Sequence, residues 1–396
     1  TPPAAGNWKE IIFKDSSIDA AIDANDKYLS GSIINHVIVE YGDGILIENS
    51  YPYISNNRFR ANSGVSRDWG CCDSPRSPLA FSHGAESNKT LIIANNIFED
   101  NSDAGIFGRT LDGPIIPPIE NVITKVQHNI IRNNGGTGFS YSNFGTSTGY
   151  SLLLSHNQIH FNNRGGVAIW WSLGPNNVVE YNLITNNSGG ATHGDGAGIG
   201  LYGGSPTIRY NSIIANSLVD DYSSMVEFGS AIGFSHAGTG GDPSITYNTV
   251  LNNSGGDAFY FVNNSDPVIN NNNISNPSNT YEVYLPSGQT TGFDMSNNWW
   301  GTTDTNIIEA KIYDFYDDFE RGEVIYSPIL TAHEVAAPIS PPSGLAVVST
   351  DTSSVTIQWN NSPESDAAGY FVYWGSDVLS YDNVVDVGNV TSYTVN

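Results

Sequence analysis

The chain has 396 residues, enough for two or three ordinary domains or for one long repeat array with an added module. Its formal net charge is −25, from 15 Lys and Arg against 40 Asp and Glu, and no basic cluster is present that could follow a phosphate backbone, so nucleic acid is not an expected partner. Only 14% of the residues are charged while Gly, Asn, Ser and Tyr are abundant, a composition typical of extracellular all-β proteins.

The localisation predicted from this composition is extracellular or cell-surface. No run of 18 apolar residues occurs, so no transmembrane segment is expected. Residues 7–23, NWKEIIFKDSSIDAAID, read like one coil of the repeat described below, with no amphipathic helix before them. An uncovered coil leaves a strand edge open, and self-association through that edge is therefore one expected interaction.

Two adjacent cysteines, Cys71 and Cys72, stand in a loop punctuated by Pro and Gly. Neighbouring Cα atoms lie about 3.8 Å apart, below the roughly 4.4–6.8 Å that an ordinary disulfide spans. Three alternatives stay open: a strained vicinal disulfide, two free thiols, or bonds to another chain.

A repeat built on asparagine occupies most of the chain. An aliphatic or aromatic residue follows each repeat Asn by two places, and an apolar residue precedes it by three. The repeat residues are Asn57, Asn96, Asn129, Asn157, Asn182, Asn211, Asn248, Asn272 and Asn298. In seven units a second Asn follows five places later, at Asn62, Asn101, Asn134, Asn162, Asn187, Asn216 and Asn253.

A Gly-led run of alternating residues follows these asparagines, as in GFSY at Phe139, GVAIWW at Val167 and GIGLYG at Ile199. A period of two predicts strands with one face inside. The shortest repeat units have about 24 residues and three short strands, and such a unit cannot bury its apolar faces alone, so the sequence predicts a parallel β-solenoid of about ten coils. Each repeat Asn is expected to adopt the left-handed conformation at a tight corner and to bond its amide to the coils on either side, forming a ladder.

The segments GSPTIRYNSIIAN, DPSITYNTVLNN and DPVINNNNIS, with the closing NNWWGTTD, resemble the right-handed parallel β-helix proteins of the pectate-lyase-like superfamily. The resemblance covers residues 8–330. It implies an all-β right-handed parallel β-helix. The superfamily includes polysaccharide lyases, glycosidases, epimerases and surface proteins without assigned chemistry, so the resemblance is stronger for fold than for function.

The β-helix is expected over residues 1–333. After Trp300 the alternation gives way to Ile308, Ile312, Phe315 and Phe319, spaced as in a short helix. Because the end of a solenoid is an open sheet edge, we expect residues 304–330 to cap the last coil.

A Pro/Ser linker is predicted at residues 334–342, and residues 343–396 resemble a fibronectin type III domain, with Trp359 on the second strand and Tyr370 and Tyr373 on the third. A full domain of this kind has about 100 residues. The expected C-terminal β-sandwich is therefore incomplete: either the chain is a fragment of a larger polypeptide, or another subunit supplies the missing strands.

The outward strand positions are the first place to look for a ligand site. Small residues, Ala168, Gly200 and Gly233, are expected to lie beside an aromatic pair, Trp170 and Tyr202, on coils about 4.8 Å apart. Flat rings beside a groove of small residues suit sugar stacking, which makes a polysaccharide one expected partner. Packing under a neighbouring loop is the alternative.

Acidic residues gather in two loops that precede the strands at Ile199 and Ile232. His193 and Asp195 come from the first loop, and Asp220 and Asp221 from the second. Both loops are expected at the same corner of adjacent coils, so these four residues form a candidate catalytic centre. Asp195, Asp220 and Asp221 also form a candidate Ca²⁺ site, because Ca²⁺ prefers carboxylate oxygens. Solvated loop polarity is the alternative, and no cofactor is required by the sequence.

Arg109 and Arg164 are expected near the groove, where their charges would favour an anionic glycan; surface ion pairs are the alternative.

Three functions follow. A non-catalytic extracellular binding or adhesion protein is favoured, because the outward rows carry no acid or base. The alternatives are a lyase, epimerase or glycosidase that acts on an acidic polysaccharide, and a subunit that assembles into fibres or a matrix.

Overall fold

The computed structural model describes residues 2–66, 75–84, 86–110, 119–143, 149–172, 176–189, 196–219, 229–234, 241–362, 364, 366–375 and 383–396. The chain divides into two compact units, Thr1–Ala337 and Pro338–Asn396. The first unit contains the Asn repeat, and the second is the short C-terminal module.

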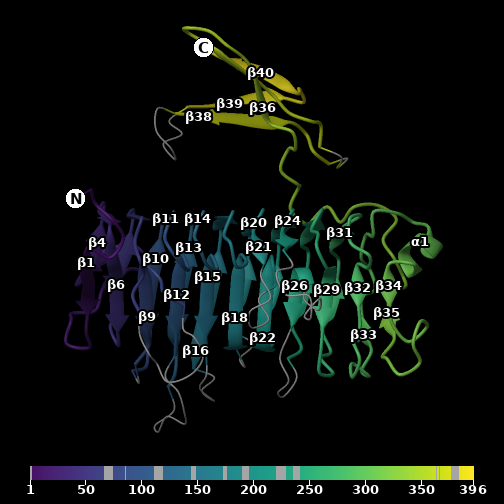
Figure 1. Cartoon of the computed structure of the whole chain (residues 1–396), viewed down its shortest axis with the longest axis horizontal. Coiled ribbons are helices and arrows are strands. Elements are labelled where there is room, and N and C mark those ends of the chain that lie inside the picture. Colours follow the sequence, from purple (N-terminus) through teal and green to yellow (C-terminus); the bar gives the residue numbers. More distant parts are fainter. Residues whose placement is uncertain are drawn as a thin grey trace. The chain divides into compact units, whose positions relative to one another are not determined.

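Three parallel sheets form the first unit, and their strands follow one another in chain order along the array (Figure 1). Sheet 1 consists of β1 (Trp8–Phe13), β6 (Gly42–Glu48), β9 (Leu79–Ser82), β12 (Ile106–Arg109), β15 (Phe139–Ser142), β18 (Val167–Ser172), β22 (Ile199–Gly204), β26 (Gly229–Phe234), β29 (Asp257–Phe261), β32 (Val283–Tyr284) and β34 (Ile312–Tyr313).

The other two sheets are parallel as well, and the strands of sheet 3 have three residues each. Sheet 2 consists of β4 (Ile33–Asn35), β7 (Tyr53–Ser55), β10 (Lys89–Ala94), β13 (Val122–Gln127), β16 (Tyr150–Ser155), β19 (Val178–Glu180), β23 (Thr207–Arg209), β27 (Ser244–Thr246), β30 (Val268–Asn270), β33 (Phe293–Asp294) and β35 (Val324–Ile325). Sheet 3 consists of β5 (Ile38–Glu40), β8 (Arg58–Arg60), β11 (Ile97–Glu99), β14 (Ile130–Arg132), β17 (Gln158–His160), β20 (Leu183–Thr185), β24 (Ser212–Ile214), β28 (Thr249–Leu251) and β31 (Asn273–Ser275).

Each sheet 3 strand therefore belongs to a coil that also supplies sheets 1 and 2. The expected all-β class and the stacked parallel coils are confirmed. Two small pairs lie outside the three sheets: β2 (Ala21–Ile22) with β3 (Tyr28–Ser30), which is antiparallel, and β21 (Ser188–Gly189) with β25 (Ser217–Leu218).

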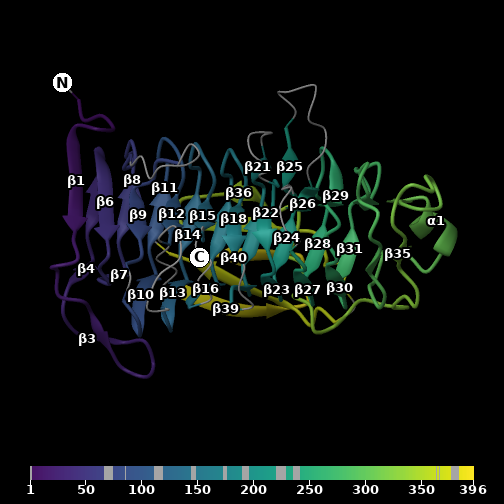
Figure 2. The same cartoon turned by 90° about the horizontal axis from the view of Figure 1, so that it is seen from below.

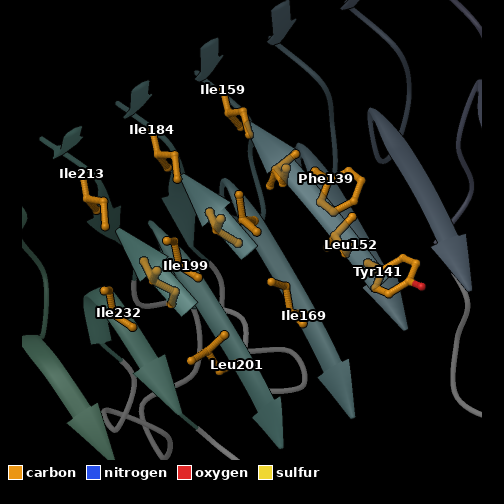
Figure 3. Close-up of a cluster of buried hydrophobic side chains, with 14 of the residues drawn as sticks. Phe139, Tyr141, Leu152, Ile159, Ile169, Ile184, Ile199, Leu201, Ile213 and Ile232 are labelled. Atoms are coloured by element: carbon orange, nitrogen blue, oxygen red, sulfur yellow. The ribbon is translucent and has the colours of Figure 1, made fainter. Parts of the chain in front are cut away.

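The core is a continuous column of aliphatic and aromatic side chains that repeat from coil to coil. Ile199 pairs in register with Ile232 on sheet 1, and Ile184 pairs with Ile213 on sheet 3. These four side chains are fully buried, and Figure 3 shows them pointing into the same interior. β-branched residues pack well on a pleated surface, which explains their abundance at these positions.

The predicted Asn ladder is confirmed, and there are two of them. In the first, the side-chain amide of each repeat Asn from Asn57 to Asn272 donates to the Oδ1 of the next at 2.9–3.0 Å. In the second, which begins at Asn62 and ends at Asn276, the distances are 2.9–3.1 Å. Each ladder amide is buried, so its bonds replace those that water would make.

The backbone conformation expected at these corners was assigned to the wrong residue. The left-handed residue is the one before each repeat Asn; His128, for example, has a φ of 55° and His156 a φ of 56°. The ladder Asn turns inward instead, because its Nδ2 also donates to a main-chain carbonyl of the preceding coil, as Asn129 does to Ile93 at 2.8 Å. The corner therefore needs one residue for the turn and another for the amide.

The last coil ends in a cap that includes a single turn of helix, α1 (Thr305–Glu309), with Asp304 as its N-cap. Ile308 lies in α1 and Ile312 in β34, but Phe315 and Phe319 lie in the connection between β34 and β35, so the helical spacing predicted for them is wrong.

At the other end, β1 is an edge strand of sheet 1, and Ile11 on it is 45% exposed.

The second unit has five antiparallel strands. β36 (Ala346–Thr350), β37 (Val355–Gln358) and β40 (Ser392–Val395) form one sheet, and β38 (Tyr370–Trp374) and β39 (Asn383–Gly388) form another. Trp359, Val372 and Glu364 are its buried side chains among the described residues, and Trp359 meets Tyr370 edge to face at 5.5 Å.

Candidate functional site

One row of outward side chains on sheet 1 changes its chemistry from coil to coil. We call it the outer row. It is aligned by strand register and consists of Glu48, Ser82, Arg109, Ser142, Trp170 and Tyr202. Figure 2 shows the strands that carry it, β6, β9, β12, β15, β18 and β22, in this order. The outer row thus combines a carboxylate, hydroxyls, a cation and two large rings.

Trp170 and Tyr202 form the aromatic end of the outer row. Their ring centroids lie 4.7 Å apart with an interplanar angle of 31°, so their predicted placement on successive coils is confirmed. Trp171, whose φ is 56°, adds a third ring that meets Tyr202 edge to face at 5.3 Å. All three side chains are half-buried, so a rigid aromatic cluster retains surface that a ligand can reach.

Arg109 lies two strands away from Trp170. At about 4.8 Å per strand, this separation is about 10 Å along the row. It is 6% exposed, and its Nε donates to the carbonyl of Thr110 at 3.3 Å. Ser142 separates the two, is 3% exposed, and has a hydroxyl that makes no hydrogen bond within the described part of the chain. Arg109 therefore shares the row with the aromatic pair, but its guanidinium is largely enclosed.

The neighbouring outward row is closed, which corrects one expectation. Ala168 is 2% exposed, and Gly200 and Gly233 are buried. Larger members of the same row, such as Leu46 and Tyr260, are also buried. The predicted groove floor of small residues is therefore not accessible. The accessible part of the site is the aromatic cluster.

Arg164 does not join the outer row. It is an exposed turn residue before β18, six residues ahead of Trp170, and thus on the order of 20 Å away at about 3.3 Å per strand residue. Its backbone amide donates to Gly136 at 3.3 Å, and its carbonyl accepts the Thr137 hydroxyl at 3.1 Å.

The acidic loop candidates, His193, Asp195, Asp220 and Asp221, lie outside the described residues, as do Cys71 and Cys72. Within the described residues, no three His, Cys, Asp or Glu side chains are arranged to hold a metal ion. Neither the Ca²⁺ site nor the acidic catalytic centre is placed by this structure.

Asp257 and Glu282, which the sequence did not single out, are carboxylates with raised pKa values on successive coils. Burial raises the pKa of Asp257, at the start of β29, to about 7. Burial also raises the pKa of Glu282 on the next coil. Glu282 has a structural role, since its two oxygens accept the backbone and side-chain amides of Asn276, at the end of the second ladder. Asp257 can exchange a proton near neutral pH, but it lies at the opposite end of the strand from the outer row.

A second set of rings stands on the corner before the first ladder. The turn stack consists of His128, His156, Tyr181, Tyr210 and Tyr247, each in the left-handed conformation. Successive centroids lie 4.9–5.2 Å apart. Each inner ring has a neighbour against both faces, so the stack presents edges to solvent and is a poor platform for a sugar ring. The sequence signal for it was the residue directly before each ladder Asn.

No helix in the described residues has the length and apolar character needed to cross a bilayer.

Comparison with known proteins agrees with this architecture. The chain matches the family model for a right-handed β-helix region over residues 9–171 and 140–274. It is 46% identical over 48 residues to Protein bark beetle of Drosophila melanogaster, a stretch that is 12% of this chain and 2% of that protein. The chain thus matches only a small part of that relative, and no solved structure gives a significant match. From the extent of the family match, the chain belongs to the right-handed β-helix family.

Proposed function

We propose that this protein is a non-catalytic, extracellular or cell-surface glycan-binding protein whose contact site is the aromatic end of the outer row. The observation that carries the proposal is the Trp170–Tyr202 pair, held at 4.7 Å by strand register and half-exposed. Aromatic rings fixed on a rigid scaffold bind the apolar face of a sugar with little loss of side-chain entropy. Trp171 braces the pair from the side at 5.3 Å.

Arg109 is the charged residue of the row nearest the aromatic pair, and its positive charge favours an anionic glycan there. The chain as a whole carries −25, which repels anions at long range, but exposed charges more than about 8–10 Å apart are screened at physiological salt. Arg109 lies within roughly that distance of Trp170. Its contribution is expected to be electrostatic rather than a direct contact, because it is 6% exposed.

A glycan array with fluorescently labelled protein tests the proposal. Trp170→Ala is expected to lower the signal of the best ligands by roughly tenfold, the loss expected for a buried aromatic anchor. Phe161→Ala is the matched control, since Phe161 is an exposed ring, 54% accessible, on a different corner of the array. Equal signals for wild type and Trp170→Ala, or equal losses for both variants, would contradict a site on the outer row.

Arg109→Gln separates charge from stacking. We expect this variant to weaken anionic glycans more than neutral ones at low salt, and the difference to shrink as salt is raised. If neutral and anionic glycans lose signal equally, Arg109 supports the fold of the site and not its selectivity.

A carbohydrate-active enzyme is the second candidate, and Asp257 is the observation that favours it. A carboxyl group with a pKa of about 7 can act as a general acid at neutral pH. The test is release of reducing sugar or unsaturated uronides from acidic polysaccharides by wild type and Asp257→Asn. Activity that disappears in Asp257→Asn supports the enzyme, and activity that survives the substitution removes this site.

Association through the exposed edge of β1 stays a prediction. Electron microscopy of the purified protein over a range of salt and Ca²⁺ concentrations tests it. Fibres or regular assemblies would support an additional role in a matrix, and isolated particles under all conditions would discard it.

A further inference from the structure

The cap over the last coil carries an aromatic surface that the glycan-binding proposal does not use. We call Phe315, Tyr316, Phe319 and Ile325 the cap patch. Phe319 is 80% exposed, Tyr316 is 64% exposed and Ile325 is 51% exposed. Phe319 and Phe315 meet edge to face at 5.3 Å. Single exposed apolar residues are ordinary, but adjacent exposed aromatics on one short loop are typical of contact surfaces.

The loop that holds the cap patch is fixed by hydrogen bonds. The Phe315 amide donates to the carbonyl of Gly322 at 2.9 Å, which closes the loop at its base. The Asp314 carboxylate, 4% exposed, accepts the amides of Tyr316 at 3.0 Å and Val324 at 2.8 Å. The aromatic side chains therefore stand on a preorganised backbone, which lowers the entropy cost of binding.

Two shallow grooves run along the cap patch, on either side of Ile325. One, of about 650 Å³, is lined by Tyr316, Asp317 and the end of α1. The other, of about 750 Å³, is lined by Phe315, Phe319 and Phe293. Both are lined by Glu323 and Ile325, so the grooves form one continuous surface. Their size fits several apolar side chains of an extended segment.

Negative charge surrounds this surface. Residues 304–325 contain seven acidic residues and two basic ones. Both cations already have partners: the Lys311 ammonium donates to the carbonyl of Pro277 in the preceding coil at 3.3 Å, and Arg321 pairs with Asp318 at 3.3 Å. The Arg321 guanidinium also lies over the Tyr313 ring at 5.2 Å. The cap patch is therefore apolar at its centre and anionic at its rim.

We propose that the cap patch is a docking surface for a partner protein that presents an extended basic segment with apolar anchors. The apolar side chains would fill the grooves beside Ile325, and Lys or Arg side chains would meet Glu320 and Glu323 at the rim. A second copy that presents its own cap patch fits poorly, because the two acidic rims would face each other. An anionic membrane is repelled by the same carboxylates.

Fluorescence anisotropy with the full chain tests the proposal. The probe is a fluorescein-labelled dodecapeptide that alternates lysine and leucine, compared with a lysine–serine peptide and a glutamate–leucine peptide, in about 0.15 M salt. Wild type is expected to bind the lysine–leucine peptide at least tenfold more tightly than either other peptide. Equal affinity for the lysine–serine peptide would show only general attraction to an acidic protein and would overturn the proposal.

Variants place the binding on the cap. Phe319→Ser is expected to raise the dissociation constant roughly tenfold, and the pair Glu320→Gln and Glu323→Gln to raise it several-fold with a weaker salt dependence. The matched controls are Phe161→Ser and Glu120→Gln, an exposed ring and an exposed carboxylate elsewhere on the array. An affinity unchanged in Phe319→Ser, or lowered equally by Phe161→Ser, would overturn the assignment. Binding to zwitterionic or anionic vesicles without binding to the peptide would do so as well.

Discussion

The inner and outer faces of sheet 1 differ in how strictly they repeat. On the inner face, Ile199 lies over Ile232, and every coil presents an apolar residue at the same level. On the outer row the sequence runs from Arg109 through Ser142 to Trp170, and each coil contributes different chemistry. The backbone is the same on both faces, so the fold constrains only the inner one. Departure from the repeat on a regular scaffold is therefore the best guide to a functional position in this protein.

The largest effect is expected where the repeat is strictest. Asn157 donates to Val126, Ser155 and Asn182 and accepts both amides of Asn129. Asn157→Ala leaves several of these buried groups without partners, so we expect the free energy of unfolding to fall by roughly 3–5 kcal/mol. Urea unfolding followed by circular dichroism measures it.

The residue next to it is the control. His156 supplies the left-handed turn and is exposed, and Asn adopts that conformation readily. His156→Asn should change the free energy of unfolding by less than about 0.5 kcal/mol. Similar losses for His156→Asn and Asn157→Ala would break the distinction between the turn residue and the ladder residue.

A buried histidine makes the interior sensitive to acid. Burial lowers the pKa of His83 from 6.5 to about 3, and the ring is stacked on Tyr51 at 5.5 Å. Because the folded-state pKa is depressed, the neutral ring stabilises the fold above pH 6.5, and this stability is lost as the pH falls toward 3. We expect a loss on the order of 2–4 kcal/mol across this window.

Chemical denaturation at several pH values, with His83→Phe beside wild type, checks this expectation. The variant removes the titrating group while keeping an aromatic ring, so its stability should fall less steeply between pH 6.5 and 3. Parallel pH profiles for the two proteins would show that other groups cause the acid sensitivity.

Asp257 should act in the opposite direction. Its pKa is raised from 3.8 to about 7, so the folded state binds the proton more tightly than the unfolded state does. The stability it contributes is present below pH 3.8 and is lost as the pH rises toward 7, by roughly 1–3 kcal/mol. In Asp257→Asn this dependence should disappear, which thermal unfolding at pH 4, 5.5 and 7.5 would show. An unchanged pH profile would indicate that the carboxyl group is well solvated.

Apart from the His156→Asn control, the smallest effect on stability is expected on the outer row. Trp170 is half-buried and lies outside the core, so Trp170→Ala should cost about 1 kcal/mol or less while it weakens glycan binding. A loss as large as that of Asn157→Ala would show that the aromatic cluster serves the fold. Unfolding and glycan binding measured on the same preparation separate the two outcomes.

The sequence predicts the repeating interior of the array more completely than its outer surface. Asn157 and Asn182 could be aligned because the ladder requires the same residue at the same corner of each coil, and this alignment also placed Trp170 beside Tyr202. The closure of the row at Ala168 could not be predicted, because nothing in local periodicity shows what lies over a strand. The pKa of Asp257 was missed for the same reason, since its burial depends on neighbouring coils and not on its own segment.

The central claim is that Trp170 and Tyr202 act together as one glycan contact. A double-mutant cycle measured by isothermal titration, with the strongest ligand from the array and the variants Trp170→Ala, Tyr202→Ala and both together, tests it most directly. We predict that each single variant binds the glycan more weakly. The loss of binding free energy in the double variant is expected to be smaller than the sum of the two single losses, with a coupling energy of about 0.5–1.5 kcal/mol. Wild-type affinity in both single variants would contradict the account.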